Sequence, residues 1–223
     1  MRKRFHQSLD ELKEKLLVMA GFAEQAIARS IEAYRMRDPE LVELVRRSEP
    51  AINRLEREID STALDLLATE QPMAVDLRFI LSVIKINGDL ERIGDQASNI
   101  AQRAEMLHDR PQISLPIDIA NMGDKVGVMI RSAIQALLEA DAKLAESVLT
   151  LDDEVDAINR TVQEELVEVM QLHPHVSEQS LNAIIISRNL ERAADHATNI
   201  AEDVIFWIRG SDVRHKMSLA EAD

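Results

Sequence analysis

Near the middle of the chain stands the stretch Leu90-Glu91-Arg92-Ile93-Gly94-Asp95-Gln96-Ala97-Ser98-Asn99-Ile100-Ala101. It recurs 100 residues later as Leu190-Glu191-Arg192-Ala193-Ala194-Asp195-His196-Ala197-Thr198-Asn199-Ile200-Ala201. Eight of the twelve positions are identical, and the identical positions include charged residues that a shared apolar core would not require. The recurrence therefore predicts an internal duplication of the chain.

Around each copy, apolar residues recur at alternating spacings of four and three. This period is typical of helices that pack against one another at a shallow angle. We call each such row of apolar residues a seam. In the first copy the seam comprises Phe79, Val83, Ile86, Leu90, Ile93, Ala97, Ile100, Ala104 and Leu107. In the second it comprises Ala183, Ile186, Leu190, Ala193, Ala197, Ile200, Val204 and Trp207.

The breaks between such segments divide the chain into six long helical stretches. We place the breaks at Pro39, Pro72, residues 109–116, Asp141 and residues 173–177, where Ser177 begins the last stretch. Pro50 falls inside the second stretch, which we therefore expect to be one bent helix. The prediction is an all-α fold of two tandem, repeat-related three-helix bundles, residues 1–111 and residues 112–223.

Composition supports the helical prediction and limits the partners. Aromatic residues make up 3% of the chain and there are only 6 glycines, too few for an all-β protein. There is no cysteine, and the net charge of −14 repels nucleic acid and anionic lipid. No apolar stretch follows the basic start, and no run approaches the ~20 apolar residues of a membrane span. We therefore expect a soluble, cytoplasmic protein that binds cations or other proteins.

The residues with chemical potential are acidic pairs spaced by four, which places both side chains on one helix face. Each copy contributes two such positions: Glu49/Asn53 with Glu91/Asp95, and Asp152/Asp156 with Glu191/Asp195. If neighbouring helices bring their pairs together, oxygen ligands converge in a site suited to magnesium, manganese, iron or zinc.

The alternative for these acids is a charged, solvated helix face. With 40 acidic residues in 223, chance alone gives about seven pairs at this spacing. Arg92 and Arg192 could simply neutralise their acidic neighbours. His196 could join the second site, although the matching position in the first copy is Gln96. His108 is interpreted as a helix-end histidine, and His173 and His175 as exposed loop residues.

Four stretches together resemble the PhoU family of phosphate-transport regulatory proteins. They are Leu90–Asp95, its second copy Leu190–Asp195, the stretch Gln71–Arg78 and the closing Gly210-Ser211-Asp212-Val213-Arg214-His215. The resemblance runs from about residue 5 to residue 215. It implies two similar three-helix bundles, often dimeric, whose acidic motifs in some members hold surface metal clusters.

The resemblance also implies a function and assigns residues to it. Such proteins are negative regulators of the phosphate-starvation response, and connect the ATPase subunit of the phosphate ABC transporter to the PAS domain of a sensor histidine kinase. The eight pair positions become the implied metal ligands. Asn53 replaces an acid, and Pro50 lies beside it, so we expect the second site to bind metal better. Asp76, Arg78, Arg92 and Arg192 are candidates for partner binding, although Asp76 and Arg78 could equally begin and cap a helix.

We therefore expect a non-enzymatic adaptor that forms a homodimer and meets the kinase and the transporter ATPase. Two other interpretations remain open at this point. One is a hydrolase that uses carboxylate-bound metal, which would need an open coordination position, a shaped pocket and a base. The other is a bundle that only stores metal or serves as a scaffold.

Overall fold

The computed structural model describes residues 2–111 and 115–210, and within them it is all-α with no strand. The predicted boundary at residues 111 and 112 borders the segment 112–114, and the predicted motif at Ser211–His215 lies beyond residue 210, so both fall outside the described residues. The six long helices are α1 (Arg2–Met36), α2 (Pro39–Glu70), α3 (Val75–Met106), α4 (Ile119–Glu139), α5 (Ala142–Leu172) and α6 (Ser177–Arg209), with a short 3₁₀ turn, η1 (Pro174–Val176), before α6.

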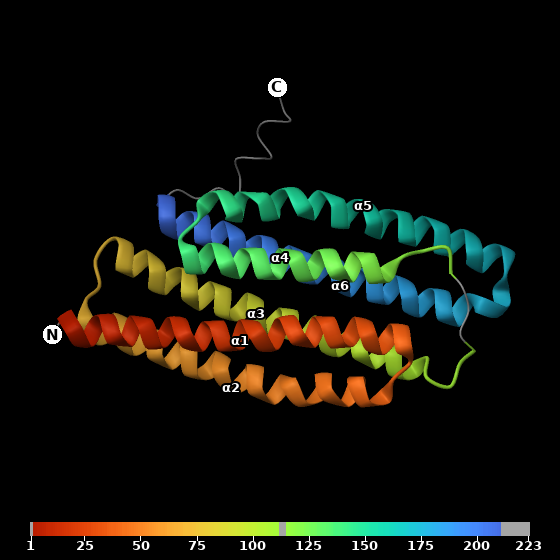
Figure 1. Ribbon diagram of the computed structural model, residues 1–223, viewed down its shortest axis with the longest axis horizontal. Helices are drawn as coiled ribbons and strands as arrows, with labels where there is room; N and C mark the ends of the chain where they lie inside the picture. Colours follow the sequence, from red (N-terminus) through yellow and green to blue (C-terminus); the bar gives the residue numbers. More distant parts are fainter. Residues whose placement is uncertain (1, 112–114, 211–223) are drawn as a thin grey trace, which may run out of the picture.

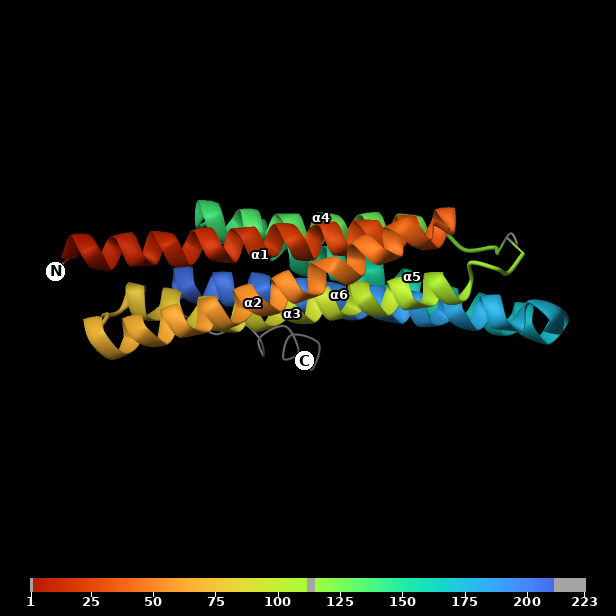
Figure 2. The same cartoon turned by 90° about the horizontal axis from the view of Figure 1, so that it is seen from below.

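The helices form two three-helix bundles that lie side by side (Figure 1). Helices α1, α2 and α3 pack pairwise, as do α4, α5 and α6, and the bundles meet mainly through α3 and α6. A second contact joins α1 to α4, and this pair lies on one side of α3 and α6 (Figure 2). Helices α2 and α5 therefore form the two outer edges, and the side of α3 and α6 that faces away from α1 and α4 is an outer surface.

The helix starts follow from local chemistry. Asp38 accepts a hydrogen bond from the backbone N–H of Glu40 at 2.8 Å, and Pro39 occupies the first turn of α2, where its missing N–H costs nothing. Asp118 and Asp141 cap α4 and α5 in the same way. Helix α2 continues through Pro50, so the prediction of a single helix there is confirmed.

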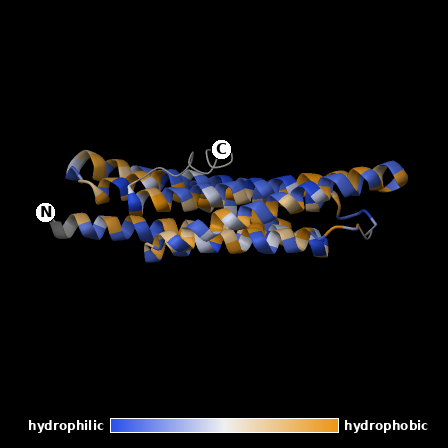
Figure 3. Cartoon of the chain, turned by 90° about the horizontal axis from the view of Figure 1, so that it is seen from above, coloured by the Kyte–Doolittle hydropathy of each residue, from blue (hydrophilic) through white to orange (hydrophobic). Residues whose placement is uncertain are grey.

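The predicted seams form the core. Every residue of the α3 seam is buried, and in α6 all are buried except Trp207, which is partly exposed. Apolar residues of all six helices belong to one continuous core, so the two bundles share their interior. Hydrophilic and hydrophobic residues alternate along the helices (Figure 3). None of the helices in the described part of the chain combines the length and the apolar character needed to cross a membrane.

Candidate functional site: two carboxylate clusters

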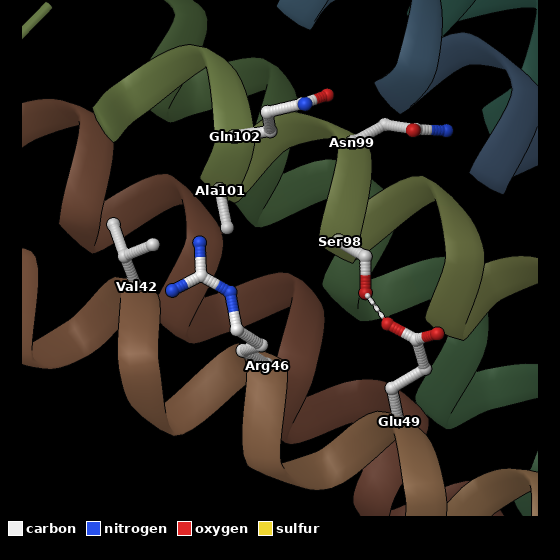
Figure 4. Close-up of a pocket in the computed structure, with 7 residues that line it drawn as sticks. All are labelled: Val42, Arg46, Glu49, Ser98, Asn99, Ala101 and Gln102. Carbon is white, nitrogen blue, oxygen red and sulfur yellow. Dashed lines mark hydrogen bonds between the residues drawn. The ribbon is translucent and has the colours of Figure 1, made fainter. Parts of the chain in front are cut away.

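The first cluster forms where α2 crosses α3. The Oγ atom of Ser98 on α3 donates a hydrogen bond to Oε2 of Glu49 on α2, at 3.1 Å. Both residues line a groove of about 210 Å³ between the two helices. Figure 4 shows Arg46 and Glu49 of α2 pointing toward Ser98 and Ala101 of α3. Arg46 crosses the same groove and is paired with Glu43 at 3.4 Å and Glu105 at 3.0 Å. The groove is polar and holds both signs of charge.

The acids of the first cluster repel one another. Partial burial, followed by the charge of Glu49, raises the pKa of Asp95. Partial burial, then the charges of Asp95 and Glu56, raise the pKa of Glu91, against the opposing effect of Arg92. Three of the four predicted residues, Glu49, Glu91 and Asp95, therefore form one electrostatically coupled group. The fourth, Asn53, is uncharged.

Glu56 is the residue that the sequence analysis missed. It follows Asn53 by three positions and Glu49 by seven, so all three share one face of α2. The periodicity could have revealed it, but alignment with Asp156 in the second copy drew attention to position 53 instead.

The second cluster brings together all four predicted acids, from α5 and α6. Burial, followed by the charges of Asp195 and Asp156, raises the pKa of Asp152 to about 6, and the neighbouring Thr198 hydroxyl opposes the rise. Burial, then Asp195 and Asp156, raise the pKa of Glu191. Burial and Asp156 also raise the pKa of Asp195. The Oδ1 atom of Asp152 is buried and has no hydrogen-bond partner among the described residues.

These clusters are not preformed chelates. Among the described residues, no three His, Asp or Glu side chains are arranged so that they could hold a metal ion. The donors are nevertheless carboxylate oxygens, which suit hard cations, and a cation would relieve the repulsion that raises their pKa values.

The four residues predicted to bind partners lie in different environments. Asp76 is in the first turn of α3, beside Phe5 and Met73 in a groove at the end of the first bundle. Arg78 donates a hydrogen bond from Nε to the carbonyl oxygen of Trp207 at 3.3 Å, and so satisfies one of the last carbonyls of α6.

Arg92 and Arg192 are both exposed and lie among acids. Arg92 lies 3.6 Å from Asp89. Arg192 lowers the pKa values of Glu191 and Asp195 against the larger effect of burial. The neutralising role considered for these arginines therefore agrees with their positions.

His196 faces the first bundle. Its Nδ1 atom lies 2.9 Å from Oδ1 of Asp89, which also accepts a hydrogen bond from Asn199 at 3.4 Å. This pair sits between α3 and α6 and joins the two halves, a contact that the sequence analysis missed. The matching residues in the other half are the neutral Asn189 and Gln96, so the pair occurs on one side only.

Fold and site together define a class: a duplicated α-helical protein that displays paired carboxylates on the outer faces of its bundles. The model of the PhoU domain matches residues 16–104 and again residues 119–204. The chain belongs to the PhoU family.

Relatives match along almost the whole chain. A "phosphate-specific transport system accessory protein PhoU homolog" of Pseudomonas aeruginosa is 39% identical over 214 residues, which cover 96% of this chain and 88% of the relative. A protein of the same name from Clostridium acetobutylicum is 33% identical over 213 residues, which cover 95% of this chain and 97% of the relative.

Solved structures agree with the fold. The crystal structure of PhoU from Pseudomonas aeruginosa superposes with a TM-score of 0.89 at 38% sequence identity, and covers 93% of this chain and 100% of that one. The crystal structure of the phosphate transport system regulatory protein PhoU from Streptococcus pneumoniae superposes with a TM-score of 0.87 at 27% sequence identity. The match covers 94% of this chain and 99% of that one. The all-α prediction and the family resemblance are confirmed.

Proposed function

We propose that this chain regulates phosphate uptake as a cytoplasmic, homodimeric adaptor between the ATPase subunit of the phosphate ABC transporter and a sensor histidine kinase. In this role it represses the phosphate-starvation response while phosphate is abundant. The observation that carries the proposal is the match over nearly the whole chain to relatives named as accessory proteins of phosphate-specific transport.

The mechanism is differential binding rather than catalysis. A regulator shifts its target between two states only by the difference in its affinity for them, so the chain must bind the non-activating state of the kinase more tightly. Long, charged outer helix faces suit such a role because they offer extended surfaces for protein contact. The groove beside the first carboxylate cluster and the groove between α3 and α6 are open and polar, unlike the concave, mostly apolar pockets that bind small substrates.

The deciding experiment measures alkaline phosphatase in cells that lack the gene and grow in abundant phosphate. We expect high activity in the deletion strain and low activity once the intact gene is restored. Low activity in the deletion strain, with no second gene of the family present, would contradict the proposal.

We also propose that the carboxylate clusters bind a divalent or iron cation, and that the second cluster binds more tightly. Asp152, Asp156, Glu191 and Asp195 would be the ligands there. In the first half, Glu49, Glu91 and Asp95 would act with Glu56 and the amide of Asn53. The support is the mutual repulsion of these acids and the unpartnered Oδ1 atom of Asp152.

Metal binding is tested by titrating the metal-free protein with Mn²⁺, Fe²⁺, Zn²⁺ and Mg²⁺ in a calorimeter. We expect the Glu191→Ala, Asp195→Ala double variant to lose the tighter site. Glu164→Ala, which removes an exposed acid elsewhere on α5, is the matched control and should bind as the wild type does. Equal binding by both variants would contradict the assignment of the ligands.

A further inference from the structure

The outer side of α2 carries exposed arginines, although the chain as a whole is strongly acidic. Arg46, Arg47, Arg54 and Arg57 are all exposed and follow one another over about three turns of the helix. Arg46 and Arg47 are both paired with Glu43, at 3.4 Å and 2.9 Å. Arg54 and Arg57 share one helix face and form neither an ion pair nor a hydrogen bond with the described residues. We call these two residues the basic edge of α2.

The acidic neighbours of the basic edge are engaged elsewhere. Within one turn along the helix, Glu58 pairs with Lys15 of α1 at 3.3 Å, and Asp60 accepts a hydrogen bond from Asn87 of α3 at 2.9 Å. Glu56 lies toward α3, beside the first carboxylate cluster. The two guanidinium groups are therefore not compensated by a direct contact within the described part of the chain.

The outer side of α5 carries the opposite charge. Glu164 and Glu168 are exposed, lie four residues apart, and likewise form no ion pair or hydrogen bond with the described residues. Like charges at this spacing destabilise a helix. Arg160 precedes Glu164 by four positions, but it is paired with Asp156 at 3.8 Å. We call Glu164 and Glu168 the acidic edge of α5.

The internal duplication shows that these charges are not part of the shared architecture. In the alignment of α2 with α5, Arg54 corresponds to Ala157, and Glu164 corresponds to Ser61. Each helix therefore carries a charge where the other is neutral. All four positions are exposed, so packing of the core requires none of these charges.

We propose that the basic edge of α2 in one copy of this chain binds the acidic edge of α5 in a second copy. Arg54 and Arg57 then face Glu164 and Glu168, since each pair spans about one helical turn. Opposite charges placed across an interface also fix which surfaces meet and in which register.

Apolar side chains accompany both edges. Leu64 lies two turns beyond Arg57 on α2 and is 60% exposed, and Val167 lies beside Glu168 on α5 and is 45% exposed. Contact between the two helices would remove part of this apolar surface from water, which favours association. The charges select the surfaces, and the apolar side chains add to the affinity.

The positions of the two edges determine the kind of assembly. Helices α2 and α5 lie on opposite sides of the molecule and make no contact with each other (Figure 1). A contact between unlike surfaces adds copies in a row, which closes only if the rotation between copies allows it. The proposed homodimer would use the same surface on both copies, so this contact is a different one and goes beyond the proposed function.

The contact should be weak and reversible. Exposed ion pairs contribute little individually, and the net charge of −14 makes two copies repel each other at longer range. Association should therefore appear as the protein concentration rises. Salt weakens both the attraction and the repulsion, so the test compares variants at one ionic strength.

The test is sedimentation velocity of the full chain over a range of concentrations. The average mass of the wild type should rise with concentration. The Arg54→Glu, Arg57→Glu variant and the Glu164→Arg, Glu168→Arg variant should each need about tenfold more protein for the same rise, because two attractions become two repulsions. An equal mixture of the two variants should associate as the wild type does, since each now carries the charge that the other lacks. Recovery in the mixture also establishes that both variants fold.

The matched control changes the net charge by the same amount on a different helix. Arg29→Glu with Arg35→Glu alters two arginines of α1, whose hydrogen-bond partners Gln25 and Glu32 belong to the same helix. Helix α1 forms neither of the two edges. This variant should associate as the wild type does.

Cross-linking identifies the surfaces directly. The chain has no cysteine, so Ser61→Cys places a single thiol beside the basic edge and Thr161→Cys places one beside the acidic edge. Both positions are exposed. With a short bismaleimide reagent, a mixture of the two variants should give more cross-linked product than either variant alone.

Three results would overturn the proposal. The first is a wild-type mass that does not change with concentration. The second is equal association by the wild type and both charge-reversed variants. The third is unchanged self-association together with weaker binding of either variant to the purified transporter ATPase subunit or kinase PAS domain, since a protein partner would then occupy the edge. Phosphatase repression by the wild type tests the proposed function separately from all three.

Discussion

Gly94→Ala tests how closely α2 and α3 must approach to bring their acids together. A Cβ atom at position 94 would lie 2.8 Å from Cδ1 of Ile52 and 3.6 Å from its Cγ2, in a fully buried contact. The Cδ1 atom is the end of a side chain that can turn, so the cost is that of overpacking, about 2 kcal/mol. The better helix propensity of alanine offsets about 1 kcal/mol of this. We expect a net destabilisation of about 1 kcal/mol.

The second half indicates how the strain is relieved. At the positions that match Ile52 and Gly94 it carries Val155 and Ala194, a shorter residue facing a larger one. In an Ile52→Val background the colliding methyl group is gone, so Gly94→Ala should gain its helix propensity and stabilise the protein by about 1 kcal/mol. The two substitutions should therefore be coupled by about 2 kcal/mol.

The assay is denaturant unfolding followed by far-UV circular dichroism on the wild type, both single variants and the double variant. Ile52→Val alone should cost about 1 kcal/mol, the usual effect of removing one buried methyl group. Coincident transitions by fluorescence and circular dichroism would justify the two-state treatment. If Gly94→Ala has the same effect in both backgrounds, the coupling is zero, and the close approach of Ile52 is not what requires glycine at position 94.

Three further predictions concern single side chains. In metal-free buffer, Asp152→Asn should stabilise the protein by roughly 1 kcal/mol at pH 7 after allowance for solvent screening. The pKa of Asp152 in the folded protein is about 6, above its ordinary value of 3.8. The stability of the wild type should therefore fall as pH rises from 3.8 to 6, and the stability of the variant should not. An equal fall in the variant would contradict the assignment of this effect to Asp152. Arg78→Met removes the hydrogen bond to the Trp207 carbonyl and should lower the free energy of unfolding by about 1 kcal/mol. Amide hydrogen exchange should become faster in the last turn of α6 and not elsewhere. Asp141→Ala removes the acceptor for the N–H of Lys143 at 2.8 Å and should lower unfolding stability by about 1 kcal/mol, whereas an unchanged denaturation midpoint would exclude the cap.

The features that sequence predicted well are those set by local periodicity. The seam of α3 is visible because alternating steps of four and three place apolar residues on one face, and every one of them is buried. The helix starts at Asp38 and Asp141 were marked by the breaks around them. The acids of the second cluster were found because the repeat aligned α5 with α2 and α6 with α3.

The features that sequence missed depend on which helices meet. The pair of His196 and Asp89 joins residues 107 positions apart, and the bond from Arg78 to Trp207 joins residues 129 apart. Both contacts require α3 to run beside α6, and the apolar periodicity of a helix does not show which helix packs against it. Glu56 was missed for a different reason, since its spacing was visible but the alignment favoured Asn53.

Two differences between the halves of the chain are compensated by residues elsewhere in the structure. Where α2 meets α3, Ile52 faces Gly94, and the matching residues Val155 and Ala194 change size in opposite directions, so the interior volume is preserved. Such paired changes are what shared packing requires. The loss of a side chain at Gly88, where the other half has Arg188, is offset in a different way. His196 of α6, which stands where the first copy has the neutral Gln96, lowers the pKa of Glu91 together with Arg92. The cation absent from α3 is therefore supplied by a residue of the other bundle, which is possible only because α3 and α6 run side by side.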